Sequence, residues 1–177
     1  MVGENLRRIK ERIRSACSGI NRDPGEISIV AVSKGRSLEQ IRQAIAAGIT
    51  DIGENRVQEA ITKYNELSAI RYPLNAIKWH MVGHLQTNKA KDAVKVFDLI
   101  QSVDSVRLAG EIDKQAAKIN KIQDILIEIK TSPEESKIGL KADESIEVIT
   151  GINKFKNINI KGLMTIAPIV DNPEKAR

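Results

Sequence analysis

Short apolar runs alternate with amphipathic helical patterns along this chain, and that alternation constrains the fold more than any other feature. The runs lie at 27–33, 50–53, 77–82, 98–102, 123–130 and 158–164. Strands that are separated by single helices need crossover connections, so they lie parallel in one sheet. Nearly continuous apolar runs also suit strands that are buried on both faces. The sequence therefore predicts an α/β domain built on a parallel sheet.

The segments between these runs carry helix signals. An N-terminal helix is expected at about 2–21, because a Pro-Gly pair then breaks the pattern. In the next segment Ser37 and Gln40 have the spacing of a capping box, and Gly48 follows the last apolar position. Apolar residues at helical spacing predict further helices from Asn55, around 108–119 and from Asp143.

Two architectures arrange parallel strands and helices in this way: a β/α barrel and an open doubly wound sheet. No G-x-G-x-x-G or G-x-x-x-x-G-K-[ST] phosphate loop follows any of the strands, which argues against the nucleotide-binding forms of the open sheet. In a barrel, functional residues collect at the carboxyl ends of the strands, where Lys34 lies. We therefore predict a single TIM-type (β/α) barrel domain over residues 1–177.

The predicted barrel is incomplete. A standard β/α barrel has eight strands, and the sequence holds about six strand patterns. Asp171 and Asn172, followed by Pro173 and Glu174, have the pattern of a helix start, yet the sequence stops before that helix would form. We expect that the last two strand–helix units, and with them the C-terminal end, are missing from this chain.

Charge and composition narrow the classes of function. The 177 residues carry a net charge of +5, but Lys and Arg are mixed with Asp and Glu along the chain, and only 3% of residues are aromatic. These features argue against a nucleic-acid partner. No stretch has the length of a membrane span and no apolar leader opens the chain, so we expect no membrane association and a cytoplasmic location. The single cysteine, Cys17, lies on an apolar helix stripe and is predicted to be a core residue.

Lys34 is the leading candidate for a functional residue. It ends the apolar run "ISIVAVSK", and burying a lysine ammonium group without a partner is costly. At an apolar barrel mouth, burial would favour the neutral amine, which attacks aldehydes. Lys34 is then a Schiff-base lysine for a carbonyl substrate or for pyridoxal phosphate. The alternative is a lysine whose stem lies along the strand end while its ammonium group reaches solvent.

Asn55 and His84 follow the second and third strand patterns. Asn55 and Gln58 have the spacing of a capping box, so Asn55 is a helix cap, a ligand contact, or both. His80 and His84 are four residues apart, but their strand-like context does not suit a shared metal, and no metal site is predicted. His84 is instead expected to border the pocket.

No catalytic residue is assigned. Amino-acid chemistry on a pyridoxal cofactor needs a proton-transfer group besides the lysine. Glu54, His84 and Asp104 are the acids or bases nearest the predicted mouth, and none of them is an obvious match. The residues at the strand ends are better suited to holding a cofactor than to turning one over.

Several blocks resemble, in order and spacing, the signature blocks of the pyridoxal phosphate homeostasis protein family. They are "AVSKGRSLEQIRQAIAAGITDIGENRVQEAITK", "IKWHMVGHLQTNKAK", "LIQSVDS", "IEIKTSPEESKIGL" and "IKGLMTIAP". The resemblance implies a barrel like the N-terminal domain of alanine racemase, with pyridoxal 5′-phosphate (PLP) held as a Schiff base on Lys34. It also implies that Asn55 and His84 lie around the cofactor ring.

The same resemblance implies a role in vitamin B6 and amino-acid homeostasis without an established reaction, with PLP-dependent apoenzymes as possible recipients. The family pattern continues into M-G-M-S-x-D and R-I-G-x-x-I-F-G segments that would hold the phosphate, and the sequence contains neither. Two alternatives remain open: a racemase-like PLP enzyme that acts on small amino acids, and a binding module without cofactor for acidic partners.

Overall fold

The computed structural model describes residues 2–70, 73, 76–132, 139–168, 170–172 and 174. Helices and strands alternate along them. Their order is α1 (Val2–Ser18), η1 (Pro24–Glu26), β1 (Val30–Val32), α2 (Leu38–Ala46), β2 (Asp51–Glu54), α3 (Val57–Ala69), β3 (Lys78–Met81), η3 (Thr87–Lys89), α4 (Ala90–Val96), β4 (Leu99–Val103), α5 (Val106–Ala117), β5 (Gln123–Glu128), α6 (Ser145–Ile152) and β6 (Ile158–Met164).

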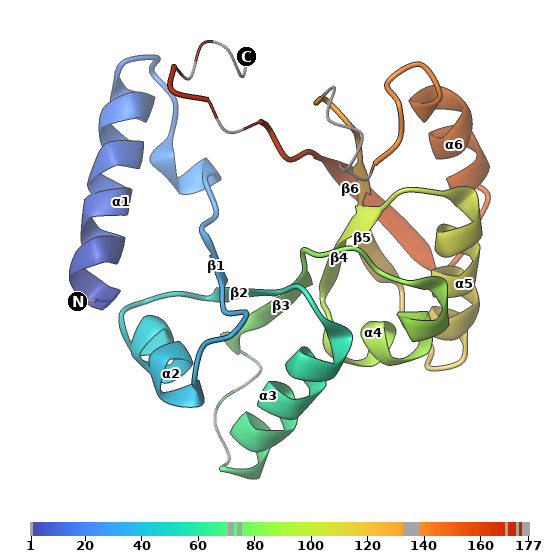
Figure 1. Cartoon of the computed structure of the whole chain (residues 1–177), viewed down its shortest axis with the longest axis horizontal. Coiled ribbons are helices and arrows are strands. Elements are labelled where there is room, and N and C mark those ends of the chain that lie inside the picture. The colour runs from blue at the N-terminus through green and yellow to red at the C-terminus, as the bar shows by residue number, and fades with distance from the viewer. Residues whose placement is uncertain are drawn as a thin grey trace.

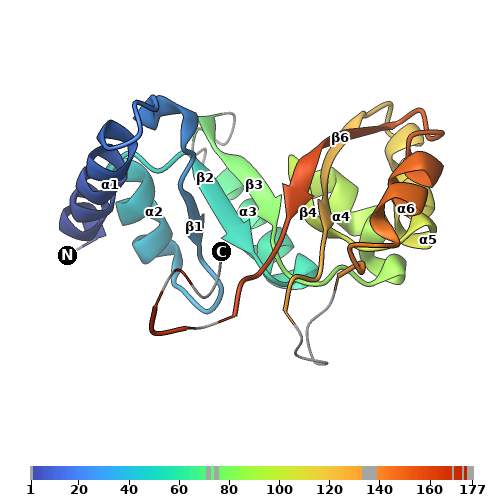
Figure 2. The same cartoon turned by 90° about the horizontal axis from the view of Figure 1, so that it is seen from above.

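All six strands are parallel and pair in one sheet in the order β1-β2-β3-β4-β5-β6. The sheet curves into an arc and the helices cover its outer side (Figure 1). The strand arrows all point toward one end of the molecule (Figure 2). Within the described residues β1 and β6 are the two edges of the sheet and do not pair, so the arc stays open. The prediction of an incomplete β/α barrel is confirmed.

The observed strands overlap the predicted ones. The prediction differs from the structure in the length of β1 and in the presence of helix α4. Strand β1 covers only Val30–Val32 of the expected 27–33. Helix α4 is absent from the sequence-based prediction, because its seven residues are too few for a clear amphipathic period. Its buried positions, Ala90, Ala93 and Val94, nevertheless have helical spacing. The fold follows from the strand–helix rhythm even where one helix is too short to detect.

Two predicted helix ends are corrected. Helix α1 ends at Ser18 instead of near residue 21, because Asn21 adopts a left-handed φ of 52°. The predicted capping box of Asn55 and Gln58 is wrong: α3 begins at Val57, and its N-cap Arg56 makes no side-chain capping bond. Asn55 is still part of the chain leaving β2, where its backbone packs against Gly83.

The core lies between the outer face of the sheet and the helices. Alternate residues of the strands supply fully buried side chains such as Ile52, Trp79 and Ile125. Tyr64 of α3 packs edge-on against Trp79, with ring centroids 5.9 Å apart. Cys17, on the buried side of α1, is a core residue as predicted. The helices therefore pack against the outer face of the sheet, and the residues that directly follow the strands lie outside this core.

The opposite, inner face of the sheet is apolar around Gly53, whereas His80 of β3 lies on the same face and is hydrogen-bonded to Asp51 and Gln101. A Cβ on Gly53 would lie 3.1 Å from Val30, 3.3 Å from Val82 and 3.4 Å from Val32, so these side chains gather on one face. Val32 is 48% exposed, because β1 is an edge strand of the described sheet. The strand that leads to Lys34 therefore ends with an apolar side chain, Val32, that solvent can reach.

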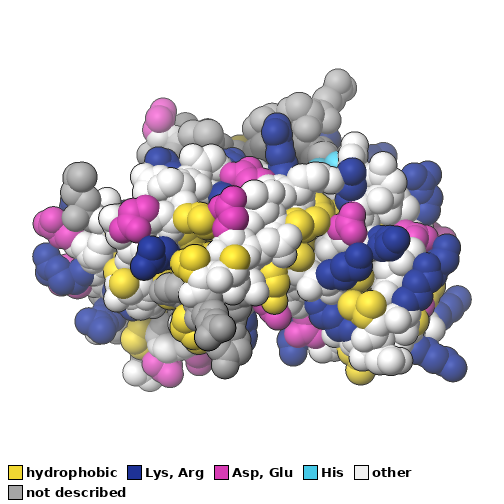
Figure 3. Space-filling view, turned by 90° about the horizontal axis from the view of Figure 1, so that it is seen from below, with side chains coloured by type: hydrophobic (Ala, Val, Ile, Leu, Met, Phe, Trp, Pro, Cys, Tyr) yellow, Lys and Arg dark blue, Asp and Glu magenta, His cyan; other side chains and the backbone are white. Residues whose placement is uncertain are grey.

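The outer surface mixes charges of both signs. Figure 3 shows Lys and Arg side chains interspersed with Asp and Glu around smaller apolar areas on one face, as expected from their spread along the sequence. Among the described residues, no helix combines the length and the apolar character that crossing a membrane requires.

The capping box of α2 gives a direct test of the local fold. Ser37 Oγ accepts a hydrogen bond from the Gln40 backbone, and the Gln40 side chain accepts one from the Ser37 backbone. Ser37→Ala should lower the free energy of unfolding by about 1 kcal/mol, measured by urea denaturation. Ser68→Ala, at an exposed serine inside α3, is the control and should be nearly neutral. Equal losses in both variants would contradict the assignment.

Candidate functional site

The carboxyl ends of β1, β2 and β3 bring the three sequence-predicted residues to one edge of the sheet. Lys34 follows β1, Asn55 follows β2 and His84 follows β3, and these strands are direct neighbours. Val32 pairs with Gly53, and the next residues remain in register, since Ser33 Oγ donates a 2.5 Å hydrogen bond to Glu54. The register therefore brings together Ser33 and Glu54, the residues that directly precede Lys34 and Asn55.

Lys34 occupies a tight turn immediately after β1. The Arg36 backbone N–H donates to the Ser33 carbonyl at 2.9 Å, which closes a four-residue turn. Gly35 takes the third position with a φ of 66°, a conformation that glycine adopts without strain. Lys34 is the second residue of this turn. The turn displays its side chain at the tip of the loop.

The expected burial of Lys34 is not observed, since its side chain is exposed. The reason lies in the position of β1. It is an edge strand of the described sheet, so no further described strand covers the inner face beside Lys34. The argument that burial alone makes this lysine reactive is therefore wrong for this structure. What remains is an accessible primary amine beside an apolar face.

A buried ionic network lies beneath the Lys34 turn, and the sequence did not predict it. Lys63 Nζ donates to Glu54 at 2.6 Å, to Glu59 at 2.7 Å and to the Ser33 carbonyl at 2.6 Å. The Gly35 N–H donates to Glu59 at 2.7 Å. Hydrogen bonds from Lys63 and then from Gly35 lower the pKa of the Glu59 carboxyl. The i, i+4 spacing of Glu59 and Lys63 was the available sequence signal.

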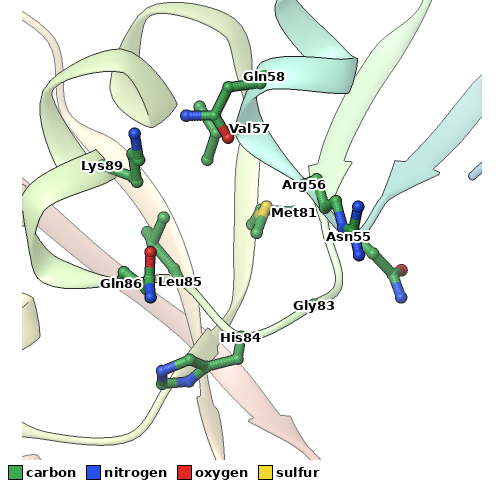
Figure 4. Close-up of a pocket in the computed structure, with 10 residues that line it drawn as sticks. All are labelled: Asn55, Arg56, Val57, Gln58, Met81, Gly83, His84, Leu85, Gln86 and Lys89. Carbon is green, nitrogen blue, oxygen red and sulfur yellow. The ribbon is translucent and has the colours of Figure 1, made fainter.

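Asn55 and His84 contribute to one pocket of about 470 Å³, together with residues from η3 and the start of α3. Gly83 joins them, because a Cβ at this position would lie 2.5 Å from the Asn55 carbonyl oxygen. Figure 4 shows that the side chains of Asn55 and His84 point to different sides of Gly83. The pocket also carries the cationic side chains of Arg56 and Lys89. Lys34 does not line it.

His84 belongs to a second cluster of ionisable groups at the same edge. Its Nδ1 lies 3.6 Å from Asp104, which follows β4. Glu128, the last residue of β5, is buried nearby. Burial raises the pKa of the Glu128 carboxyl, Asp104 raises it further, and His84 acts in the opposite direction. The sequence-based interpretation named Asp104 and missed Glu128, which stands out only as an acid within an apolar strand.

His80 lies apart from His84. Its Nε2–H donates a 2.9 Å hydrogen bond to Asp51, and its Nδ1 accepts one of 2.9 Å from the Gln101 amide, whereas His84 lies in the loop after β3. No group of three or more potential metal ligands occurs in the part of the chain that the structure describes. The two histidines therefore have separate surroundings.

The arrangement at this edge suits a flat molecule that carries an aldehyde. Lys34 offers a primary amine, Val32 and Val82 offer an apolar surface, and Asn55 and His84 offer polar groups. A primary amine condenses with an aldehyde to form a Schiff base. The residues present at the strand ends thus fit a pyridoxal-type cofactor by their chemistry.

Known proteins resemble this chain closely in sequence. The family described as the alanine racemase N-terminal domain matches residues 4–177. The pyridoxal phosphate homeostasis protein of Aquifex aeolicus (strain VF5) is 38% identical over 174 residues, which cover 98% of this chain and 74% of that protein.

Solved structures resemble it as well. PipY of Synechococcus elongatus PCC7942, with PLP bound, is 35% identical and superimposes with a TM-score of 0.80 over 99% of this chain and 74% of PipY. Alanine racemase of Clostridium difficile 630 superimposes with a TM-score of 0.64 at 18% identity, over 78% of this chain and 35% of the racemase. This second likeness concerns the fold alone.

The raised pKa of Glu128 predicts a pH dependence of stability. The folded state holds the Glu128 proton above the ordinary pKa of 4.5, so it loses stability relative to the unfolded chain as the pH rises through that value. Glu128→Gln removes this loss. Urea denaturation from about pH 4 to pH 7 should show the variant gaining stability over the wild type as the pH rises.

Glu59→Gln is the matched comparison, because the pKa of Glu59 is lowered in the folded state. Its stability relative to the wild type should change in the opposite direction and at lower pH, falling as the pH rises toward 4.5 and staying level above that value. The same trend in both variants would contradict the description of the Glu128 environment.

Proposed function

This chain belongs to the pyridoxal phosphate homeostasis protein family, and from that premise we propose that it binds PLP through Lys34 and serves intracellular PLP and amino-acid homeostasis. The proposal goes on to assign Asn55 and His84 to the surroundings of the cofactor. Its central support is one observation: Lys34 is an accessible amine at the tip of a turn fixed to the carboxyl end of β1.

The residues of this chain have separable tasks in the proposed complex. PLP supplies an aldehyde that forms a Schiff base with a lysine amine. Lys34 provides that amine, and the apolar face around Val32 provides a surface for a planar ring. Asn55, which follows the neighbouring strand β2, provides an amide that donates and accepts hydrogen bonds.

His84 has a weaker claim than Asn55. Its side chain points away from Asn55 (Figure 4) and lies near Asp104. We propose that His84 borders the cofactor from the β3–β4 side and that its partner Asp104 restrains the orientation of the ring. An imidazole held in this way contributes a hydrogen bond of defined direction.

We propose a carrier role in preference to catalysis. The related proteins are named as homeostasis proteins and not as enzymes. Tyr64, the tyrosine within the described residues, packs against Trp79 in the helix layer and so lies away from the strand ends. PLP-dependent apoenzymes are then the proposed recipients of the cofactor.

The assignment of Lys34 predicts the result of one substitution. After incubation with PLP and reduction with borohydride, the intact mass of the wild type should rise by one pyridoxyl group, and Lys34→Ala should lose that increase. The circular dichroism spectrum should not change, because the side chain is exposed. Lys78→Ala removes an exposed lysine at the opposite end of β3 and should keep the mass increase.

Two results would overturn this assignment. One is an equal mass increase in Lys34→Ala, which would mean that another lysine forms the adduct. The other is a wild type that gains no pyridoxyl group at saturating PLP, which would favour a binding module without cofactor.

The carrier role predicts a lack of amino-acid turnover. Deuterium incorporation at the α-carbon of L-alanine should proceed no faster with the PLP-loaded protein than with Lys34→Ala plus free PLP. Racemase-like catalysis would instead give exchange that depends on Lys34 and on protein concentration. That result would replace the carrier proposal with the enzymatic one.

A further inference from the structure

We propose that Glu54, Glu59 and Lys63 form a positioning clamp that orients the Lys34 turn for Schiff-base formation. The proposal rests on the assignment of Lys34 as the cofactor lysine. None of the three residues is proposed to touch the cofactor. They act on the peptide groups that flank Lys34.

The clamp holds the turn on both sides of Lys34. On one side, the Ser33 carbonyl accepts a hydrogen bond from Lys63, and the Ser33 hydroxyl donates one to Glu54. On the other side, the Gly35 N–H donates to Glu59. The Ser33 N–H is also engaged, by the Gly53 carbonyl at 2.9 Å. The side chain of Lys34 is exposed, on a backbone that is hydrogen-bonded before and after it.

The network is built from buried charges, which is unusual for a surface turn. The Glu54 side chain is 0% exposed, Lys63 is 8% exposed and Glu59 is 30% exposed. Buried ion pairs often stabilise a fold no more than apolar side chains of similar size would. Glu54 Oε2 also lacks a hydrogen-bond partner among the described residues. We therefore infer that these ion pairs serve to orient the Lys34 turn and not only to stabilise the fold.

The clamp also separates the two lysines by role. The ammonium group of Lys63 has three N–H donors, and its three hydrogen bonds go to Ser33, Glu54 and Glu59. Lys63 is therefore occupied as a cation and does not compete for an aldehyde. Lys34 follows Ser33, which Lys63 contacts, and its exposed amine can be reached by an aldehyde. The network thereby directs the reaction to one of two neighbouring amines.

Orientation matters because the amine must approach the aldehyde carbon along a defined direction. A misplacement of about 1 Å reduces reactions between bound groups by roughly 10²-fold. If the turn loses its hydrogen bonds to Glu59, Lys34 samples more directions. Binding of the ring and phosphate, which does not need the amine, should change little.

Glu59→Ala is the most informative variant. It removes the acceptor of the Gly35 N–H and leaves the buried pair of Lys63 and Glu54 in place, so the chain should still fold. We expect the equilibrium constant for Schiff-base formation with PLP, followed by visible absorption, to fall about tenfold. Affinity for pyridoxine 5′-phosphate, which has no aldehyde, should stay within about twofold of the wild type.

Three further variants complete the experiment. Glu59→Gln keeps an acceptor oxygen for Gly35 and should restore most of the Schiff-base equilibrium. Glu66→Ala removes an exposed glutamate from the same helix and should match the wild type. The double variant Glu54→Gln with Lys63→Met removes the buried pair, leaves only the partly exposed carboxylate of Glu59 without its cation, and should resemble Glu59→Ala.

The outcomes distinguish a failure of the clamp proposal from a failure of the proposed PLP-binding function. Unchanged Schiff-base formation in Glu59→Ala, with a Lys34 adduct in the wild type, would overturn the clamp and leave the function intact. Equal losses for PLP and pyridoxine 5′-phosphate would also overturn it, because they would indicate a general structural role. A wild type without a Lys34 adduct would overturn the proposed function and the clamp with it.

Discussion

The parallel pairing of β1, β2 and β3 is the constraint on which the site depends. Parallel strands end at the same edge of a sheet, so residues that follow them come together even though they are far apart in the chain. Here the register extends past the ladder itself through the contact of Ser33 with Glu54. That contact joins the residues that directly precede Lys34 and Asn55. Any loss of this pairing would disperse the candidate site.

Charge is used differently on the two sides of the sheet at this edge. On the helix side, the ammonium group of Lys63 pairs with both Glu54 and Glu59 beneath the β1 turn. On the inner side, Val32 and Val82 provide an apolar face next to the turn that carries the exposed side chain of Lys34. The ionic network and the apolar side chains therefore lie on opposite faces of the sheet.

The fold was predictable because its signals are local and repeated. The alternation of apolar runs and capped helices identified the parallel sheet, and the capping box at Ser37 was found at its predicted place. The family resemblance is confirmed by relatives such as the Aquifex aeolicus protein. Helix α4 escaped detection because its seven residues span only about two turns.

The site was less predictable, because it depends on contacts between distant residues. Position alone indicated Lys34, but its exposure follows from the place of β1 at the edge of the sheet. The hydrogen bond from Lys63 to Ser33 joins α3 to the β1 turn across thirty positions of sequence, so the i, i+4 spacing of Glu59 and Lys63 shows their pairing but not this contact. Glu128 gains its raised pKa from burial and from Asp104, which arrives from another strand.

The central claim concerns which amine reacts, and peptide mapping of the wild-type protein tests it most directly. The protein would be loaded with PLP, reduced with borohydride, digested, and sequenced by tandem mass spectrometry. The account predicts that the pyridoxyl group is found on Lys34, with Lys63 unmodified. A pyridoxyl group found mainly on Lys63, or spread evenly over surface lysines, would contradict it.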